Sequence, residues 1–162
     1  MPIRRIVKHL GHKRWFARLG KAIVPLDRGM AKLTRGRVVA LGLIPSLTLT
    51  TIGKRSGEPR TQPLAYVPDG DDIILIGSNW GSSHHPAWSY NLLANPRASV
   101  RLKGKTYGVT ARLVTGPERE EKWRMALQIW PAYATYKERA AHREIRVFHL
   151  TKDKSKKSSG TM

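Results

Sequence analysis

The sequence predicts a mainly β (α+β) domain, a small antiparallel barrel of about six strands with peripheral helices. Two observations favour this class. Most of the strand-like segments are short and are joined by turns of hairpin length. Strands and helices also do not alternate regularly along the chain, which argues against a doubly wound parallel sheet. The length of 162 residues suits one domain with a terminal extension.

The first three strands are expected at 46–52, 62–67 and 72–78. The first alternates polar and apolar residues and is rich in Thr, as half-buried strands are. Pro68-Asp69-Gly70-Asp71 separates the second and third strands with residues that β-turns favour. The third strand contains Ile73-Ile74-Leu75-Ile76, an apolar run that predicts burial on both faces.

The other three strands are expected at 98–103, 106–114 and 145–151. Gly104-Lys105 would form the two-residue hairpin loop between the first two of them. A short helix is expected at 86–94, between the strands expected at 72–78 and 98–103.

A longer helical region follows the second hairpin strand. Thr115-Gly116-Pro117-Glu118 predicts a capping box with Pro at the first helical position. Pro131 interrupts the region, so we expect one helix at 118–129 and another at 132–142.

The chain has no Cys, which excludes a disulfide scaffold, a thiolate metal site and a Cys nucleophile. Its 30 Lys and Arg against 11 Asp and Glu give a net charge of +19. Such an excess implies an anionic partner, which could be nucleic acid, anionic lipid or a ligand bearing phosphate or carboxylate.

The charge divides the chain into a basic arm at 1–40, a barrel domain at 41–151 and a disordered basic tail at 152–162. The arm has eleven basic residues and one acid, a net charge of +10. Its sequence predicts two amphipathic helical segments with apolar faces out of phase across Gly11. Such an arm either packs on its own domain, lies on an anionic membrane, or binds RNA or a protein. The N-terminus lacks the features of a signal peptide, so we expect a cytoplasmic protein, peripheral on the inner face of the cell membrane if the arm binds lipid.

Two segments contain residues that suggest ligand binding and that folding alone does not require. The first is Thr51-Ile52-Gly53-Lys54-Arg55-Ser56-Gly57-Glu58-Pro59-Arg60, which links two expected strands. Glycines let backbone N–H groups converge on an anion, and arginines bind phosphate or carboxylate bidentately. The alternative is a solvated basic hairpin loop.

The second segment runs from Gly77 to Leu92, after the most buried strand, and enters a helix near Pro86. Small residues at the strand's end leave room for a ring system, and Trp88 and Asn91 share a helix face. The neighbouring His84 and His85 point in different directions and have no further ligand at metal spacing, so no metal site is predicted.

Aromatic residues recur along the later helical region. The strip consists of Trp123, Leu127, Trp130, Tyr133 and Tyr136. Such a strip is usually core, but the two tyrosines follow Pro131 and could instead line a pocket.

Two motifs then suggest a family. Thr50–Leu64 reads Thr-Thr-x-Gly-Lys-Arg-Ser-Gly-x-x-Arg-x-x-Pro-Leu, and Pro86–Pro96 reads Pro-Ala-Trp-Ser-Tyr-Asn-Leu-x-Ala-Asn-Pro. With Gly77-Ser78, they resemble the deazaflavin (coenzyme F420)-dependent nitroreductase family of actinobacteria, many of whose members reduce quinones. The resemblance covers about 40–150. It implies a split, FMN-binding-like β-barrel and hydride transfer from the reduced deazaflavin to a quinone-like, unsaturated or nitro acceptor.

The resemblance also implies the site residues. The loop would hold the coenzyme's phosphate and glutamyl tail through Gly53, Lys54, Arg55, Ser56, Gly57 and Arg60. The deazaflavin would lie near Pro63, Gly77, Ser78, Asn79, Trp88 and Asn91. Ser78, Tyr133 and Tyr136 are the catalytic candidates, because a hydroxyl there would bond the acceptor oxygen and relay a proton. Ala65 and Trp130 stand where the nitroimidazole-activating member has Tyr, and Asn79 replaces a common Lys.

Two other functions fit parts of the sequence. The same fold could bind FMN, and the charge alone would suit a non-catalytic barrel that binds nucleic acid. Against nucleic acid, the aromatic residues lie on expected helices and are not interleaved with basic residues on strands. A quinone acceptor in the bilayer would give the basic arm a role at the membrane surface.

Overall fold

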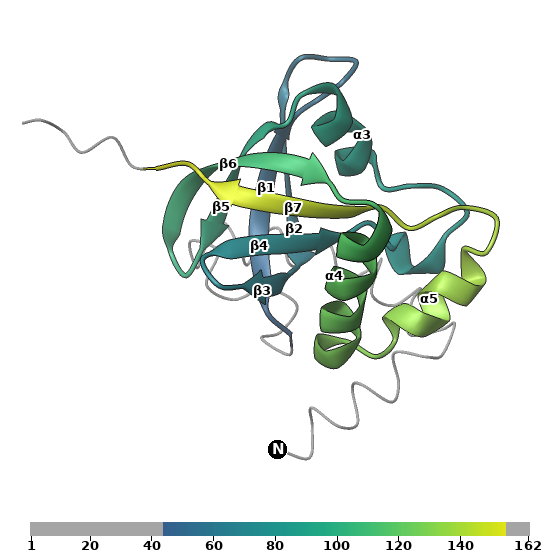
Figure 1. The fold of residues 1–162 in the computed structure, drawn as a ribbon. Helices are drawn as coiled ribbons and strands as arrows, with labels where there is room; N and C mark the ends of the chain where they lie inside the picture. The colour runs from purple at the N-terminus through teal and green to yellow at the C-terminus, as the bar shows by residue number, and fades with distance from the viewer. Residues whose placement is uncertain (1–43, 155–162) are drawn as a thin grey trace, which may run out of the picture.

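The structure is a computed structural model and describes residues 44–154. The predicted arm at 1–40 and the residues 155–162 of the predicted tail lie outside the described residues. Seven antiparallel strands form one curled sheet in the order β2-β1-β5-β6-β7-β4-β3, and three helices pack around it (Figure 1). The fold class is therefore confirmed.

The strand bounds follow the expected ones closely. The strands are β1 (Ser46–Ile52), β2 (Pro59–Ala65), β3 (Val67–Asp69), β4 (Asp72–Ile76), β5 (Arg97–Leu102), β6 (Lys105–Leu113) and β7 (Val147–Lys152). The helices are α3 (Ala87–Ala94), α4 (Gly116–Ile129) and α5 (Tyr133–Arg139).

The sheet has seven strands where about six were expected, because the segment expected as one strand at 62–67 is divided. β2 pairs with β1 and β3 pairs with β4, at opposite ends of the strand order. The division falls at Tyr66, whose backbone N–H donates to the carbonyl oxygen of Pro45 at 3.0 Å. One short segment thus supplies both edges of the sheet, which therefore has to curl.

The β5–β6 hairpin turns one residue earlier than the sequence suggested. Leu102 pairs with Lys105, so the loop is Lys103-Gly104 and not Gly104-Lys105. Both loop residues have positive φ, 51° and 78°. Two positive φ values are what the right-handed twist of a two-residue hairpin requires, and this requirement decides the register.

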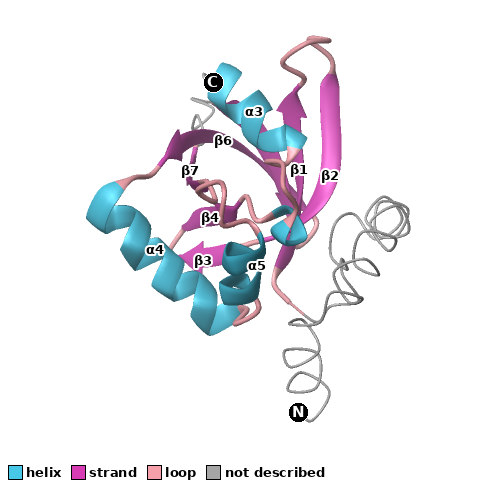
Figure 2. Cartoon of the chain, turned by 90° about the vertical axis from the view of Figure 1, so that its right-hand side faces the viewer, coloured by secondary structure: helices cyan, strands magenta, loops and turns pink. Residues whose placement is uncertain are grey.

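β4 lies between two apolar clusters, as its unbroken apolar run predicted. Ile73 and Leu75 pack with Trp88 and Leu92 of α3 inside the curled sheet. Ile74 and Ile76 belong to the second cluster, which α4 and α5 cover. Figure 2 shows α4 and α5 on one side of the sheet and α3 near the β1–β2 end.

The predicted capping box at Thr115 is wrong. Thr115 is the N-cap residue of α4, but its side chain makes no capping hydrogen bond. Glu118 instead accepts two hydrogen bonds from the Arg112 guanidinium, both at 2.8 Å. Arg112, six residues before Glu118, thus takes the carboxylate that the capping box would use, and a bidentate bond to an arginine is stronger than the reciprocal bond of a capping box.

No helix in residues 44–154 has the length and apolar character needed to cross a membrane.

Candidate active site

A groove of about 1040 Å³ separates the β1–β2 hairpin from α3. One wall is the hairpin loop with Lys54, Arg55 and Arg60, and the other carries Trp88 and Asn91. The remaining lining residues are Thr51, Gly53, Ser56, Pro59, Thr61, Gln62, His84, His85, Ala87 and Tyr90. None of the lining residues is acidic, so the groove has a positive potential that favours an anionic ligand.

Backbone hydrogen bonds give the loop its shape. The N–H of Gly53 donates to the carbonyl oxygen of Glu58, and the N–H of Gly57 donates to that of Gly53, both at 2.8 Å. A Cβ on Gly53 would overlap the Ser56 hydroxyl and meet the Glu58 carbonyl at 3.3 Å. The tight turn therefore needs glycine at 53, and it leaves the basic side chains exposed at the groove.

Asn91 ties this loop to α3. Its Oδ1 accepts a hydrogen bond from the Lys54 backbone N–H at 2.9 Å. Its Nδ2 donates to the Thr51 hydroxyl at 3.0 Å. Because Asn91 is buried and both ends of its amide are used, it holds the two walls of the groove at a set distance.

An apolar pocket of about 300 Å³ adjoins the groove, and Gln62 and Trp88 line both. Its walls bring together Ser78 from the end of β4 and Tyr133 and Tyr136 from α5. The other lining residues are Ile44, Pro63, Leu64, Ala65, Ile76, Asn79, Trp80, Pro86 and Trp130. The structure therefore combines a cationic groove and an aromatic pocket in one site.

The structure thus gathers nearly all of the residues that the sequence singled out. Gly53, Lys54, Arg55, Ser56, Arg60, Trp88 and Asn91 line the groove. Pro63, Ser78, Asn79, Tyr133 and Tyr136 line the pocket, together with Trp88. Gly57 and Gly77 line neither cavity. Gly57 lies inside the loop, and the Gly77 N–H donates to the Arg146 carbonyl oxygen at 2.8 Å.

The two tyrosines are both core and pocket residues, so the alternatives raised by the aromatic strip are not exclusive. Each is at least nine-tenths buried, and their rings contact edge-on with centroids 6.1 Å apart. Burial raises the pKa of both Tyr133 and Tyr136. Both phenols therefore keep their protons near neutral pH and can donate hydrogen bonds into the pocket.

A left-handed turn connects β4 to this site. Asn79, Trp80 and Gly81 have φ values of 45°, 57° and 76°. The two residues with side chains cost about 1–2 kcal/mol each in this region. The turn sets the Trp80 ring edge-on to Tyr136, with centroids 5.9 Å apart, which helps to offset that strain.

Sequence reasoning missed Arg143 and the role of His85. The Arg143 guanidinium donates to the carbonyl oxygens of Gly77, Ser78 and Ser82 at 3.2, 2.8 and 3.0 Å. It also lies 3.2 Å from His85 Nδ1. Arg143 is about 60 residues from these partners in sequence and belongs to no motif, so nothing local could have shown the contact.

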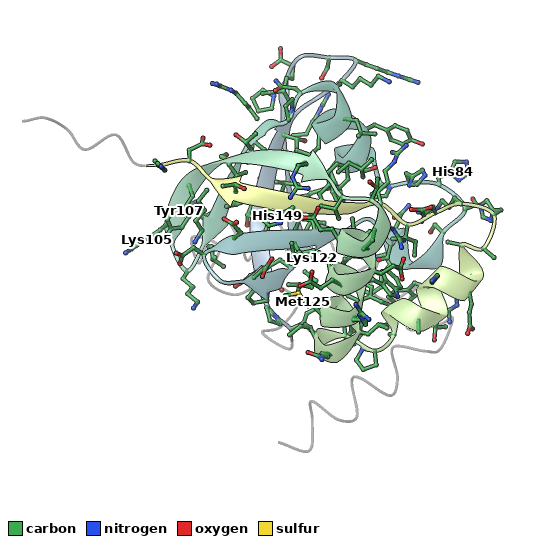
Figure 3. All side chains as sticks on the ribbon, in the orientation of Figure 1. His84, Lys105, Tyr107, Lys122, Met125 and His149 are labelled. Carbon is green, nitrogen blue, oxygen red and sulfur yellow. The ribbon has the colours of Figure 1, made fainter. Side chains whose placement is uncertain are left out.

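Burial lowers the pKa of His85, and the nearby Arg146 and Arg143 lower it further. His84, by contrast, is exposed, and its ring pairs with the neighbouring Ser83 hydroxyl. In Figure 3, His84 lies at the end of the molecule opposite Lys105 and Tyr107 of the β5–β6 hairpin. In residues 44–154, no three His, Asp or Glu side chains gather as a metal site.

Comparison with known proteins agrees with this geometry. The family model for F420H(2)-dependent quinone reductases matches residues 28–152. A Mycobacterium tuberculosis F420H(2)-dependent quinone reductase is 36% identical over 104 residues, which are 62% of this chain and 70% of the relative.

Two solved structures are also similar to this chain. An F420-H2 dependent reductase is 36% identical with a TM-score of 0.61, and the match covers 66% of this chain and 94% of that one. A structure described as a domain-swapped dimer is 32% identical with a TM-score of 0.63, covering 77% and 95%.

The anchoring role of Asn91 predicts a loss of stability in Asn91→Ala. The change leaves the Lys54 N–H and the Thr51 hydroxyl without their partner, so we expect the free energy of unfolding to fall by about 1–3 kcal/mol. Hydrogen exchange at the Lys54 amide should accelerate with it. Asn95→Ala is the matched control, because Asn95 accepts one bond, from the Arg97 N–H, in a more exposed position. Equal losses in both variants, with Lys54 still protected, would contradict the anchoring role.

Proposed function

This chain belongs to the F420H(2)-dependent quinone reductase family, and we propose from that premise that it reduces a quinone-like acceptor with reduced coenzyme F420. The observation that supports this most is that the acid-free cationic groove and the aromatic pocket adjoin and share Gln62 and Trp88 in their linings. A ligand with an anionic tail and a flat ring system would use both parts. The bound coenzyme supplies the hydride, and the protein supplies binding, orientation and electrostatics.

The groove residues fit the anionic part of the coenzyme. Lys54, Arg55 and Arg60 are all exposed and line the groove, and Glu58 of the same loop is not among the lining residues. We propose that they bind the phosphate and the glutamyl tail, with Ser56 as a further donor. Asn91 would act mainly by holding the loop against α3, since both ends of its amide are already bonded.

The pocket residues fit the ring and the acceptor. Trp88 lines both cavities and offers an apolar wall at their junction. We propose that Ser78, Tyr133 and Tyr136 hold the acceptor oxygen by hydrogen bonds and deliver a proton to it. Burial raises the pKa of both phenols and keeps them protonated, which supports their role as hydrogen-bond donors to the acceptor oxygen.

Charge reversal at Arg60 tests the coenzyme assignment. Arg60→Glu removes a charge-assisted contact worth about 1.5–3 kcal/mol, so we expect the affinity for coenzyme F420 to fall about 10–150-fold. Quenching of intrinsic Trp fluorescence would measure it. The matched control is Arg124→Glu, an exposed position on α4 that lines neither cavity. Equal affinity in Arg60→Glu and wild type, or tighter binding of FMN than of coenzyme F420, would refute the assignment.

Removal of single hydroxyls tests the acceptor site. Tyr136→Phe and Tyr133→Phe keep the packed ring, and Ser78→Ala keeps the small side chain. If these groups donate to the acceptor, at least one variant should lower kcat/KM for a soluble quinone by about 10²-fold or more. The dissociation constant of the coenzyme should stay within about threefold, because these changes leave the cationic groove intact. Unchanged kcat/KM in all three would show that the proton comes from elsewhere.

We further propose that the basic arm holds the protein at an anionic membrane surface, on the inner face of the cell membrane. The proposal rests on the arm's net charge of +10 and its amphipathic sequence. Ile44, the first residue that the structure describes, lines the apolar pocket that we propose as the acceptor site. A protein held at the membrane surface would meet a quinone dissolved in the bilayer.

Vesicle sedimentation tests this role with the full chain. We expect it to pellet with anionic vesicles at low salt and to be partly released at high salt, since each basic side chain near the surface contributes about 1 kcal/mol. Replacing Arg14, Arg18 and Lys21 with Gln should weaken binding much more than replacing Arg97, Lys105 and Arg124 with Gln. Protein that stays in the supernatant at low salt would exclude the membrane role.

A further inference from the structure

His85 stands between two cavities. It lines the coenzyme groove and also a cleft of about 370 Å³ that is lined by Arg119, Arg143 and Arg146. Its side chain is half-buried, and it belongs to the segment that runs from β4 into α3. The ring is therefore in a position to contact a ligand in the groove while its other side is held by the protein.

The contact with Arg143 decides the protonation of the ring. Arg143 Nη1 and His85 Nδ1 are 3.2 Å apart in hydrogen-bonding geometry. A guanidinium has only donors, so Nδ1 must be the acceptor and cannot carry a hydrogen. This hydrogen bond requires His85 to be a neutral imidazole whose single hydrogen is on Nε2.

The groups around His85 favour the neutral imidazole with its hydrogen on Nε2. Three backbone carbonyls hold the Arg143 guanidinium in place, so it cannot easily turn away from the ring. The Tyr90 ring contacts His85 edge-on at 5.9 Å, and the Arg146 guanidinium lies over Tyr90 at 4.5 Å. A proton on Nδ1 would remove the acceptor for Arg143 and add a third positive charge beside two arginines.

We propose that His85 donates a hydrogen bond from Nε2 to an oxygen of the coenzyme in the groove, and that Arg143 is the positioning residue that sets its tautomer. This rests on the proposed function, because it takes the groove as the coenzyme site. Of the other polar groups suggested for the coenzyme, Lys54, Arg55 and Arg60 are charged, and the neutral Ser56 hydroxyl lies in the exposed loop. His85 adds a neutral donor whose direction is fixed, which suits orientation of the ligand better than attraction of its charge.

Two amide substitutions separate this role from a structural one. In His85→Gln the amide nitrogen can occupy the place of Nε2 and donate to the ligand. In His85→Asn the shorter amide reaches only the place of Nδ1, where its oxygen can still accept from Arg143. We expect His85→Gln to bind coenzyme F420 within about threefold of wild type and His85→Asn to bind about 5–10-fold more weakly, by Trp fluorescence titration. The reverse order, or equal affinity in the two variants, would overturn the proposal.

A second measurement needs no variant and no coenzyme. Long-range ¹H–¹⁵N correlation spectra of the wild-type imidazoles at pH 7 should show His85 with a bare Nδ1 and a protonated Nε2. In Arg143→Gln we expect a mixture of tautomers and weaker coenzyme binding. A wild-type ring with its hydrogen on Nδ1, or a doubly protonated ring, would also overturn the proposal. Failure of wild-type protein to bind coenzyme F420 at all would instead refute the proposed function, whatever the tautomer.

Discussion

The covalent continuity of residues 59–69 constrains the whole domain. β2 and β3 lie at opposite ends of the strand order, yet only Tyr66 separates them in the chain. One intervening residue spans only about 7 Å, so the two edges of the sheet must come together. The sheet therefore curls around the cluster of apolar side chains that includes Leu49, Leu75 and Phe148. The curl brings Gln62 and Pro63 of β2 into the walls of the apolar pocket that Ser78 and the α5 tyrosines complete.

The geometry of the site depends on a small number of polar contacts between segments that the curled sheet brings together. Asn91 joins the basic loop to α3, and Arg143 joins the segment after β4 to the residues that follow α5. Each uses one side chain to bond several groups of a segment that is distant from it in sequence. Such contacts add stability, but their larger effect is to hold two walls of a cavity in one arrangement. The strained turn at Asn79 and Trp80 lies between these contacts, where surrounding structure can hold it in place.

Three positions at which the resemblance implies another residue fall in one place: Tyr is implied at Ala65 and Trp130, and Lys at Asn79. Ala65, Asn79 and Trp130 all line the apolar pocket, and none lines the cationic groove. A shared coenzyme and a different acceptor would produce this division, because the groove meets the anionic tail and the pocket meets the molecule that is reduced. The Trp130 indole also donates to the Tyr136 hydroxyl at 3.4 Å, so a substitution at the pocket wall acts on a proposed catalytic group.

The sequence by itself determined the features that depend on neighbours along the chain. The alternation of 46–52 marked β1, the run Ile73–Ile76 marked the strand buried on both faces, and the glycines around Lys54 marked the loop that lines the groove. The resemblance of the two motifs to those of a known family indicated the family. Tertiary structure decided the rest: the division at Tyr66, the hairpin register at Lys103, the loss of the capping box and the contacts of Arg143. A twist requirement decided the hairpin register, and Arg112, six residues away, took the carboxylate of the capping box. Partners far away in sequence decided the division at Tyr66 and the contacts of Arg143, and no local pattern records such partners.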